Sequence, residues 1–197
     1  MNGFEKRSRQ IKEKIVKTTI DLLGTTDPNR IRIADIANAA KVSQVTIYNH
    51  FESKENLLRE AIKQFLEVMI ADFETYLNES HSLKEKIEYI LFREKQYFKL
   101  IPPRVLQELM LSDPEMAGYV ERIYLEKSLP MTVRILEEGK QNGEISERVS
   151  IENVLALMQL YMNQYETMLR MAGESGDVER FVEEMVHLFF YGICGKE

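Results

Sequence analysis

The chain has 197 residues, 44% of them hydrophobic and 29% charged, which is the balance of an ordinary folded cytosolic protein with a substantial core. Its single cysteine, Cys194, excludes an intrachain disulfide and a zinc framework, and its most apolar run, "VLALMQLYM" at 154–162, is too short to span a bilayer. The stretch "MNGFEKRSRQIKEK" has charge but no apolar segment, so we expect no signal peptide, no membrane association and a cytoplasmic location.

The net charge of −6 is unevenly distributed along the chain. Residues 1–54 hold 10 Lys and Arg against 6 Asp and Glu, a net charge of +4, whereas residues 55–197 carry a net charge of −10. This asymmetry suggests a basic segment that meets a polyanion, joined to an acidic body that does not. Charge alone does not establish nucleic-acid binding.

Apolar residues recur at helical spacing along almost the whole chain, and no alternating strand pattern is long enough to matter. We therefore predict an all-α fold of about nine helices. The turn "GTTDPNR" at 24–30 ends the first helix, and a long helix runs from Ser53 to about Asn78. Pro102 and Pro103 stop the helix that begins near Ser82.

The second half of the chain carries further helix boundaries. The sequence "DPE" at 113–115 is typical of a helix start, because it combines a capping carboxylate with a proline in the first turn. Pro130 lies inside the next helical pattern and predicts a kink or break. We expect a loop over 139–150, with Ser150 capping a helix over 151–171, then a linker over 173–177 and a last helix over 178–193.

Residues 31–51 are typical of two short helices joined by a tight turn. "IADIANAA" has small residues where helices can cross, Ser43 is a good N-cap, and "QVTIYNHF" buries Ile47 and Phe51 on one face. The other face presents short polar groups, which can reach base edges when a helix lies in a major groove of DNA. The first turn and outer face of this helix present Ser43, Gln44, Val45, Thr46, Tyr48, Asn49 and His50.

The stretch from about Lys12 to Leu58 resembles the N-terminal domain of the tetracycline-repressor (TetR) family of bacterial transcription regulators. The resemblance rests on "IADIANAAKVS", "IYNHF" and "SKENLL", and the rest of the chain is similar in helix layout only. Three positions depart from the family pattern: Arg32 replaces the usual Ser or Thr, Lys41 replaces the glycine of the turn, and Val45 replaces a residue that is often small. The matching residues are Tyr48, His50, Phe51, Ser53, Lys54 and Leu57.

The resemblance implies a repressor that binds double-stranded DNA at an inverted repeat. It implies a helix-turn-helix domain over 1–54, which continues into a linking helix to about 78, and an effector-binding and dimerisation domain over 79–197. Gln44 and Thr46 are expected to read bases and Tyr48 to contact phosphate, while the basic cluster over 6–14 lies on the phosphate backbone or is a solvated helix end. The expected DNA contacts are Arg32, Ser43, Gln44, Val45, Thr46, Tyr48, Asn49, His50 and Lys54.

The resemblance also implies a homodimer and an effector pocket. The last two helices are apolar on more than one face, which favours a dimer interface built from Met158, Met162, Phe181, Met185 and Phe189. A small, largely apolar effector is expected among aromatic and methionine side chains, although each of these could equally be plain core. The candidates are Tyr89, Phe92, Arg93, Tyr97, Met110, Tyr124, Met131, Met158, Tyr161 and Tyr165.

The other classes of function are an enzyme and a protein-interaction module. An enzyme is not expected, because His50, His81 and His187 match no metal spacing and no nucleophile motif or phosphate-binding glycine loop is present. We therefore expect no catalytic residue, no metal and no cofactor. The alternative is a dimeric helical protein-interaction module without sequence-specific DNA binding.

Overall fold

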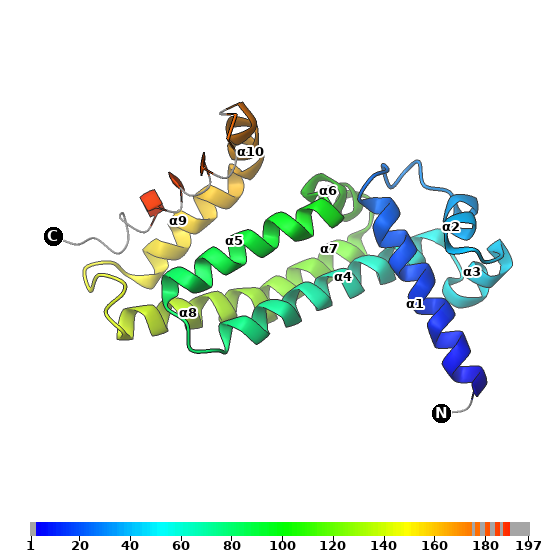
Figure 1. Ribbon diagram of the computed structural model, residues 1–197, viewed down its shortest axis with the longest axis horizontal. Helices are drawn as coiled ribbons and strands as arrows, with labels where there is room; N and C mark the ends of the chain where they lie inside the picture. The colour runs from blue at the N-terminus through cyan, green and yellow to red at the C-terminus, as the bar shows by residue number, and fades with distance from the viewer. Residues whose placement is uncertain (1–2, 175, 178–179, 182–183, 186, 190–197) are drawn as a thin grey trace. The chain divides into compact units, whose positions relative to one another are not determined.

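The computed structural model describes residues 3–174, 176–177, 180–181, 184–185 and 187–189, without the side chains of residues 4, 162, 165, 166, 169 and 172. In these residues every regular element is helical, which confirms the predicted all-α class (Figure 1). The elements are α1 (Gly3–Leu23), α2 (Ile33–Ala40), α3 (Gln44–Phe51), α4 (Lys54–Leu77), α5 (Leu83–Leu100), α6 (Pro103–Ser112), α7 (Pro114–Ile123), the π-helical segment η1 (Tyr124–Ser128), α8 (Leu129–Gln141), α9 (Ile151–Asn163) and α10 (Tyr165–Glu174).

The chain divides into two compact units. Unit 1 comprises Met1–Thr75 and Leu91–Ser128, and unit 2 comprises Tyr76–Ile90 and Leu129–Glu197. Helices α1 to α3 and α4 as far as Thr75 belong to unit 1.

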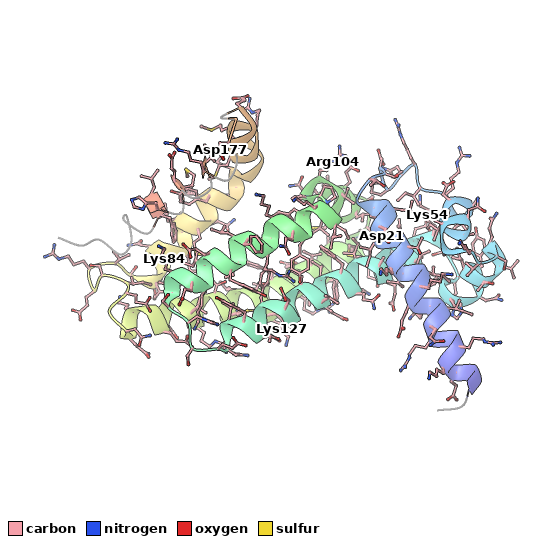
Figure 2. All side chains as sticks on the ribbon, in the orientation of Figure 1. Asp21, Lys54, Lys84, Arg104, Lys127 and Asp177 are labelled. Carbon is pink, nitrogen blue, oxygen red and sulfur yellow. The ribbon has the colours of Figure 1, made fainter. Side chains whose placement is uncertain are left out.

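Unit 1 is built on a tightly sealed core. Helix α1 packs on α2 and α2 packs on α3, and the side chains of Ile15, Ile36, Ile47 and Leu57 are fully shielded from solvent. The apolar positions that predicted these helices therefore lie on the buried faces of the helices. Lys127 of η1, which is labelled in Figure 2, forms an ion pair with Glu74 farther along α4 at 3.7 Å.

Gly24 allows the end of α1 to approach the end of α5 closely. A Cβ at position 24 would lie 2.5 Å from the Leu100 carbonyl oxygen, which is a backbone atom that cannot rotate away. The turn after α1 therefore needs glycine for space, since the backbone there is not left-handed.

Unit 2 contains a second close approach and a buried ion pair. Helix α8 packs on α9, and a Cβ added at Gly139 would come within 2.7 Å of the Leu83 side chain. Lys86 is buried, and its ammonium pairs with Glu138 at 2.7 Å. The Tyr76 ring is stacked between those of His81 and Tyr89, at centroid distances of 4.1 and 3.7 Å.

Most helix boundaries follow the signals in the sequence. Helix α1 ends before Gly24, α5 ends before Pro102, and Asp113 caps α7 as predicted. Ser150 caps α9 by accepting a hydrogen bond from the Asn153 N–H at 3.2 Å.

Three boundaries differ from the prediction. The loop expected from residue 139 is wrong at its start, because α8 continues to Gln141 and its glycine is buried against Leu83. The helix expected over 151–171 is interrupted at Gln164, between α9 and α10. The interruption expected at Pro130 takes the form of the π-helical turn η1 just before it, because a proline cannot donate the hydrogen bond that an α-helical turn needs. The helix predicted over 178–193 falls largely outside the described residues.

We predict opposite effects on stability for two glycine-to-alanine changes in unit 1. Gly24→Ala forces a methyl group onto the Leu100 carbonyl and should lower the free energy of unfolding by about 1–3 kcal/mol. Gly118→Ala, in α7, meets no atom within 4 Å and should raise it by about 0.5–1 kcal/mol. Urea denaturation of both variants measures the difference, and equal effects would contradict the close packing of α1 on α5.

Candidate DNA-binding site

The outer face of α3 is the candidate DNA-binding surface. Ser43 caps the helix: its Oγ accepts a hydrogen bond from the Thr46 N–H at 3.0 Å and lies 2.8 Å from the Thr46 Oγ1. Ile47 and Phe51 are buried on the opposite side, as predicted. Since the first turn is satisfied by Ser43, α3 is pre-formed with its outer face free.

Apolar as well as polar groups lie on this outer face. Val45 is 66% exposed and Tyr48 is 48% exposed, while Gln44 and Asn49 are exposed beside them. Exposed apolar side chains next to amide side chains suit a base edge, where an apolar group can meet a thymine methyl group. Thr46 and His50 are only half-buried, and the Thr46 hydroxyl retains hydrogen-bonding capacity beyond its contact with Ser43.

Left-handed residues precede and follow α3. Lys41, in the turn before it, has φ 52° and ψ 49°, and Glu52, just after it, has φ 66° and ψ −40°. Neither is glycine, so each conformation is strained, by about 1–2 kcal/mol at Lys41. The turns persist because they close hydrogen bonds: Val42 N–H donates to the Ala37 carbonyl at 3.0 Å, and Ser53 N–H to the Phe51 carbonyl at 2.7 Å.

Arg32 and Lys54 lie at the starts of α2 and α4. Arg32 is exposed and has no acceptor with which to cap α2, and Asp35 instead accepts a hydrogen bond from its backbone N–H at 2.9 Å. The Lys54 ammonium donates to the Pro28 carbonyl at 2.8 Å (Figure 2). An ammonium has three donors, so this internal bond leaves two for a phosphate.

The basic N-terminal cluster is partly used inside the protein. Lys12 pairs with Glu60 of α4 at 2.7 Å, and its ammonium lies 5.8 Å from the centre of the Phe51 ring. Arg9 pairs with Glu13 along α1 at 3.5 Å. Lys6, Arg7 and Lys14 are exposed.

An ion-pair cluster on α4 and α7 connects the helix after the DNA-binding face to the rest of unit 1. The Asp113 Oδ1 caps α7 by accepting from the N–H groups of Glu115 and Met116 at 3.0 and 3.2 Å. Its Oδ2 accepts from the Arg59 guanidinium, which also pairs with Glu115 at 3.0 Å. The hydrogen bond from Arg59 lowers the pKa of Asp113. The sequence revealed the cap but not Arg59, because the two residues are 54 positions apart.

The predicted effector-pocket residues of unit 1 have different surroundings. Arg93 donates to Asp72 at 2.7 Å, to Gln96 at 2.6 Å and to the Tyr97 hydroxyl at 3.1 Å. Tyr97 is buried, and burial raises its pKa. Phe92 and Tyr124 are 60% and 47% exposed, and Met110 is half-buried.

In unit 2, a residue predicted for the effector pocket contacts a residue predicted for the dimer interface. Tyr161, predicted for the pocket, meets Phe189, predicted for the dimer interface, edge to face at 6.0 Å. Tyr89, Met131, Met158, Phe181 and Met185 are half-buried. The side chains of Met162 and Tyr165 lie outside the described residues. The roles of both sets stay predictions.

A polar recess of about 530 Å³ lies elsewhere in unit 2. Its lining includes His81, Lys86, Glu138 and Glu144, and none of the predicted pocket residues takes part. The Lys86 and Glu138 pair and the hydrogen bond from Leu83 N–H to Glu144 at 2.8 Å use much of its polar lining internally.

Across the described residues, no helix is long and apolar enough to cross a membrane. In the same part of the chain, no group of three His, Cys, Asp or Glu side chains is arranged to hold a metal ion.

Residues 15–61 match the family described as bacterial regulatory proteins, tetR family. This N-terminal stretch is therefore a DNA-binding domain of the TetR family. The matched stretch contains all nine predicted DNA contacts, from Arg32 to Lys54, and the chain is a DNA-binding transcription regulator.

Relatives in the TetR family extend the likeness beyond this stretch. The chain is 24% identical to the fatty acid metabolism regulator protein of Bacillus subtilis (strain 168), over 97% of this chain and 100% of that protein. It is 27% identical to the HTH-type transcriptional repressor KstR2 of Mycolicibacterium smegmatis, over 62% of this chain and 61% of that protein. The crystal structure of the transcriptional regulator FadR from Bacillus subtilis in complex with stearoyl-CoA has the same fold, with a TM-score of 0.70 and 22% identity over 92% of this chain and 98% of that one.

We predict that Asp113 stabilises the TetR-type fold of this chain in two separable ways. Asp113→Ala loses the cap as well as the ion pair and should lower the free energy of unfolding by about 1–2 kcal/mol through the cap alone. Asp113→Asn keeps an oxygen for the cap and loses the charge. Because the folded-state pKa of Asp113 is lowered, the ion-pair part is present above the ordinary aspartate pKa and is lost as the pH falls through the lowered value. Denaturation at pH 7 and pH 3 should show the gap between wild type and Asp113→Asn shrinking in acid, and a gap independent of pH would contradict the ion pair.

Proposed function

We propose that this regulator is a cytoplasmic repressor that binds an inverted-repeat operator as a homodimer and is released by a long-chain acyl-CoA. The observation that carries the DNA-binding part is the outer face of α3, which is capped by Ser43 and exposes Gln44, Val45 and Tyr48. One such helix fills one major groove, so a dimer that reads two successive grooves needs half-sites about 34–36 Å apart.

The proposed effector comes from the relatives. A fatty acid metabolism regulator matches 97% of the chain, and a regulator with the same fold was crystallised with stearoyl-CoA. The tyrosine and methionine side chains predicted to line the pocket suit an acyl chain, because they are polarisable and largely apolar.

The proposal also assigns a role to each part of the chain. Residues 1–54 serve DNA, α4 links them to the body, and residues 79–197 hold the effector and the dimer interface. The predicted interface residues Met158, Phe181, Met185 and Phe189 supply apolar surface for a bundle formed with a second copy. The shared helix α4 and the Arg59 to Asp113 contact offer a route by which a change in the body reaches α3.

Selection of bound duplexes from a random-sequence library tests the DNA-binding role at physiological salt. We expect an inverted repeat. Tyr48→Phe should weaken binding to all duplexes alike because it removes a phosphate contact, whereas Gln44→Ala should change the preferred sequence because it removes a base contact. Enrichment of no sequence would favour the protein-interaction module, and unchanged affinity of Tyr48→Phe would contradict the proposed docking of α3.

Release of the selected operator by stearoyl-CoA tests the effector. Since the ligand favours the conformation that does not bind DNA, a saturating concentration should weaken operator affinity about 5- to 150-fold. Coenzyme A without an acyl chain is the control and should have little effect, because it lacks the apolar part. An operator complex that is insensitive to both molecules would rule out an acyl-CoA effector and leave the DNA-binding role standing.

A further inference from the structure

The interior stripe of α5 contains a carboxyl group. Positions 83, 87, 90, 94 and 97 follow one another at intervals of three or four residues and so lie on one side of the helix. Leu83, Ile87 and Tyr97 are buried there, Ile90 is half-buried, and the member between Ile90 and Tyr97 is Glu94. A charged group at the middle of an apolar stripe is costly unless it has a partner.

Glu94 has no such partner in the described part of the chain. It forms no hydrogen bond or ion pair there, although the neighbouring Arg93 makes three hydrogen bonds to other side chains. Lys86, which is a buried cationic residue of α5, is paired with Glu138. The carboxyl of Glu94 therefore differs from Lys86 and Arg93 of the same helix, which both have partners.

The space around this carboxyl is not sealed. Every fully buried side-chain nitrogen or oxygen of the described residues has a hydrogen-bond partner. Because the Glu94 oxygens have none, they border accessible space even though the side chain is half-buried. A polar group on an interior stripe, open to space and unpaired among the described residues, is the arrangement expected of a group that meets a ligand.

Desolvation raises the pKa of Glu94 to about 7, and it is the whole cause of the shift. Neither Asp72 of α4 nor Arg93 and Tyr97 of α5, the titratable groups joined in the network beside it, contributes. No charged side chain of α6, α7 or η1 contributes either. Near neutral pH the carboxyl is therefore protonated about half the time and can donate a hydrogen bond.

We propose that Glu94 is a specificity-determining residue of the effector site, where its protonated carboxyl donates a hydrogen bond to the thioester carbonyl oxygen of a long-chain acyl-CoA. This inference rests on the proposed function. The thioester carbonyl is the polar group attached directly to the acyl chain. When the acyl chain packs against the apolar side chains around Glu94, this carbonyl is the polar group that comes near the carboxyl. A neutral acid matches a neutral carbonyl oxygen, whereas the ionised form offers that oxygen no donor.

Affinity for stearoyl-CoA, measured by calorimetry below the concentration at which it forms micelles, tests this. Only the protonated form binds well, so the wild-type dissociation constant should rise about tenfold from pH 6 to pH 8 for a pKa of about 7. Glu94→Gln keeps a donor but cannot ionise, so its affinity should stay near the wild-type pH 6 value at both pH values. Glu94→Leu has no donor and should bind weakly at both. Glu88→Gln is the matched control, because Glu88 is an exposed residue of α5 paired with Lys84 at 3.7 Å, and it should follow the wild-type profile.

A second ligand, S-octadecyl-CoA, tests whether the thioester carbonyl oxygen accepts the hydrogen bond from Glu94. In S-octadecyl-CoA a methylene group replaces the thioester carbonyl, so wild type and Glu94→Gln should bind it with the same pH dependence. Equal pH profiles of wild type and Glu94→Gln for stearoyl-CoA would overturn the inference, as would a difference that persists with S-octadecyl-CoA. Absence of stearoyl-CoA binding to the wild type at pH 6 would instead refute the acyl-CoA effector itself.

Thermal unfolding without ligand gives an independent check on Glu94. Its folded-state pKa is raised, so the folded protein is penalised increasingly as the pH rises from the ordinary glutamate value through about 7. The melting temperature of Glu94→Gln relative to wild type should therefore increase from pH 5 to pH 8. A relative melting temperature that does not change with pH would show a solvated carboxyl and would also overturn the inference.

Discussion

The continuity of α4 is the constraint on which the rest of unit 1 depends. Its first turns contribute Leu57, Leu58 and Ala61 to the buried core of unit 1. Its later turns contribute Phe65 and Phe73, whose rings each form a T-shaped pair with the Tyr97 ring. One uninterrupted helix of 24 residues is a stiff rod of about 36 Å. The orientation of α3 is therefore coupled mechanically to the packing around Tyr97, whatever moves that packing.

Two electrostatic arrangements of opposite character lie along this rod. Near its start, Arg59 and Asp113 are mutually satisfied and hold α7 against α4. Farther along, Asp72 of α4 pairs with Arg93 of α5, while Glu94 of α5 has no partner among the described residues. A satisfied pair fixes a geometry, whereas an unsatisfied interior carboxyl responds to what enters the space beside it. The Arg59 and Asp113 pair therefore suits the transmission of a structural change between helices. The Glu94 carboxyl suits the detection of a ligand.

The parts of this structure that could be predicted from the sequence are those controlled by neighbours along the chain. Ser43, Asp113 and Ser150 cap helices because the groups they satisfy are two or three residues away. The positive φ at Lys41 follows from the turn that the family pattern reveals. These features need no knowledge of tertiary contacts.

Features that depend on distant residues were not predictable in the same way. Gly139 resembles a loop residue in the sequence, but it lies in a helix because Leu83 packs against it. Arg59 gave no local signal of its partner Asp113. Glu94 is visible in the sequence as an interruption of the apolar stripe of α5, but only the structure shows that no cation of the described residues pairs with it. Two of the aromatic residues predicted for the pocket, Phe92 and Tyr124, are exposed, because residue type alone does not place a side chain on the buried face of a helix.

The ion pair between Lys12 and Glu60 has a consequence for how the protein and DNA exchange counterions. Lys54 differs, because its partner is the neutral Pro28 carbonyl and its charge stays available to a phosphate. A lysine whose charge stays paired with a carboxylate on DNA displaces no condensed cation from the duplex. Each lost phosphate contact of this kind reduces the slope of log affinity against log salt concentration by about 0.9. Operator affinity should therefore depend less steeply on ionic strength than the ten basic residues of the first 54 positions imply, and more of it must come from shape and base contacts.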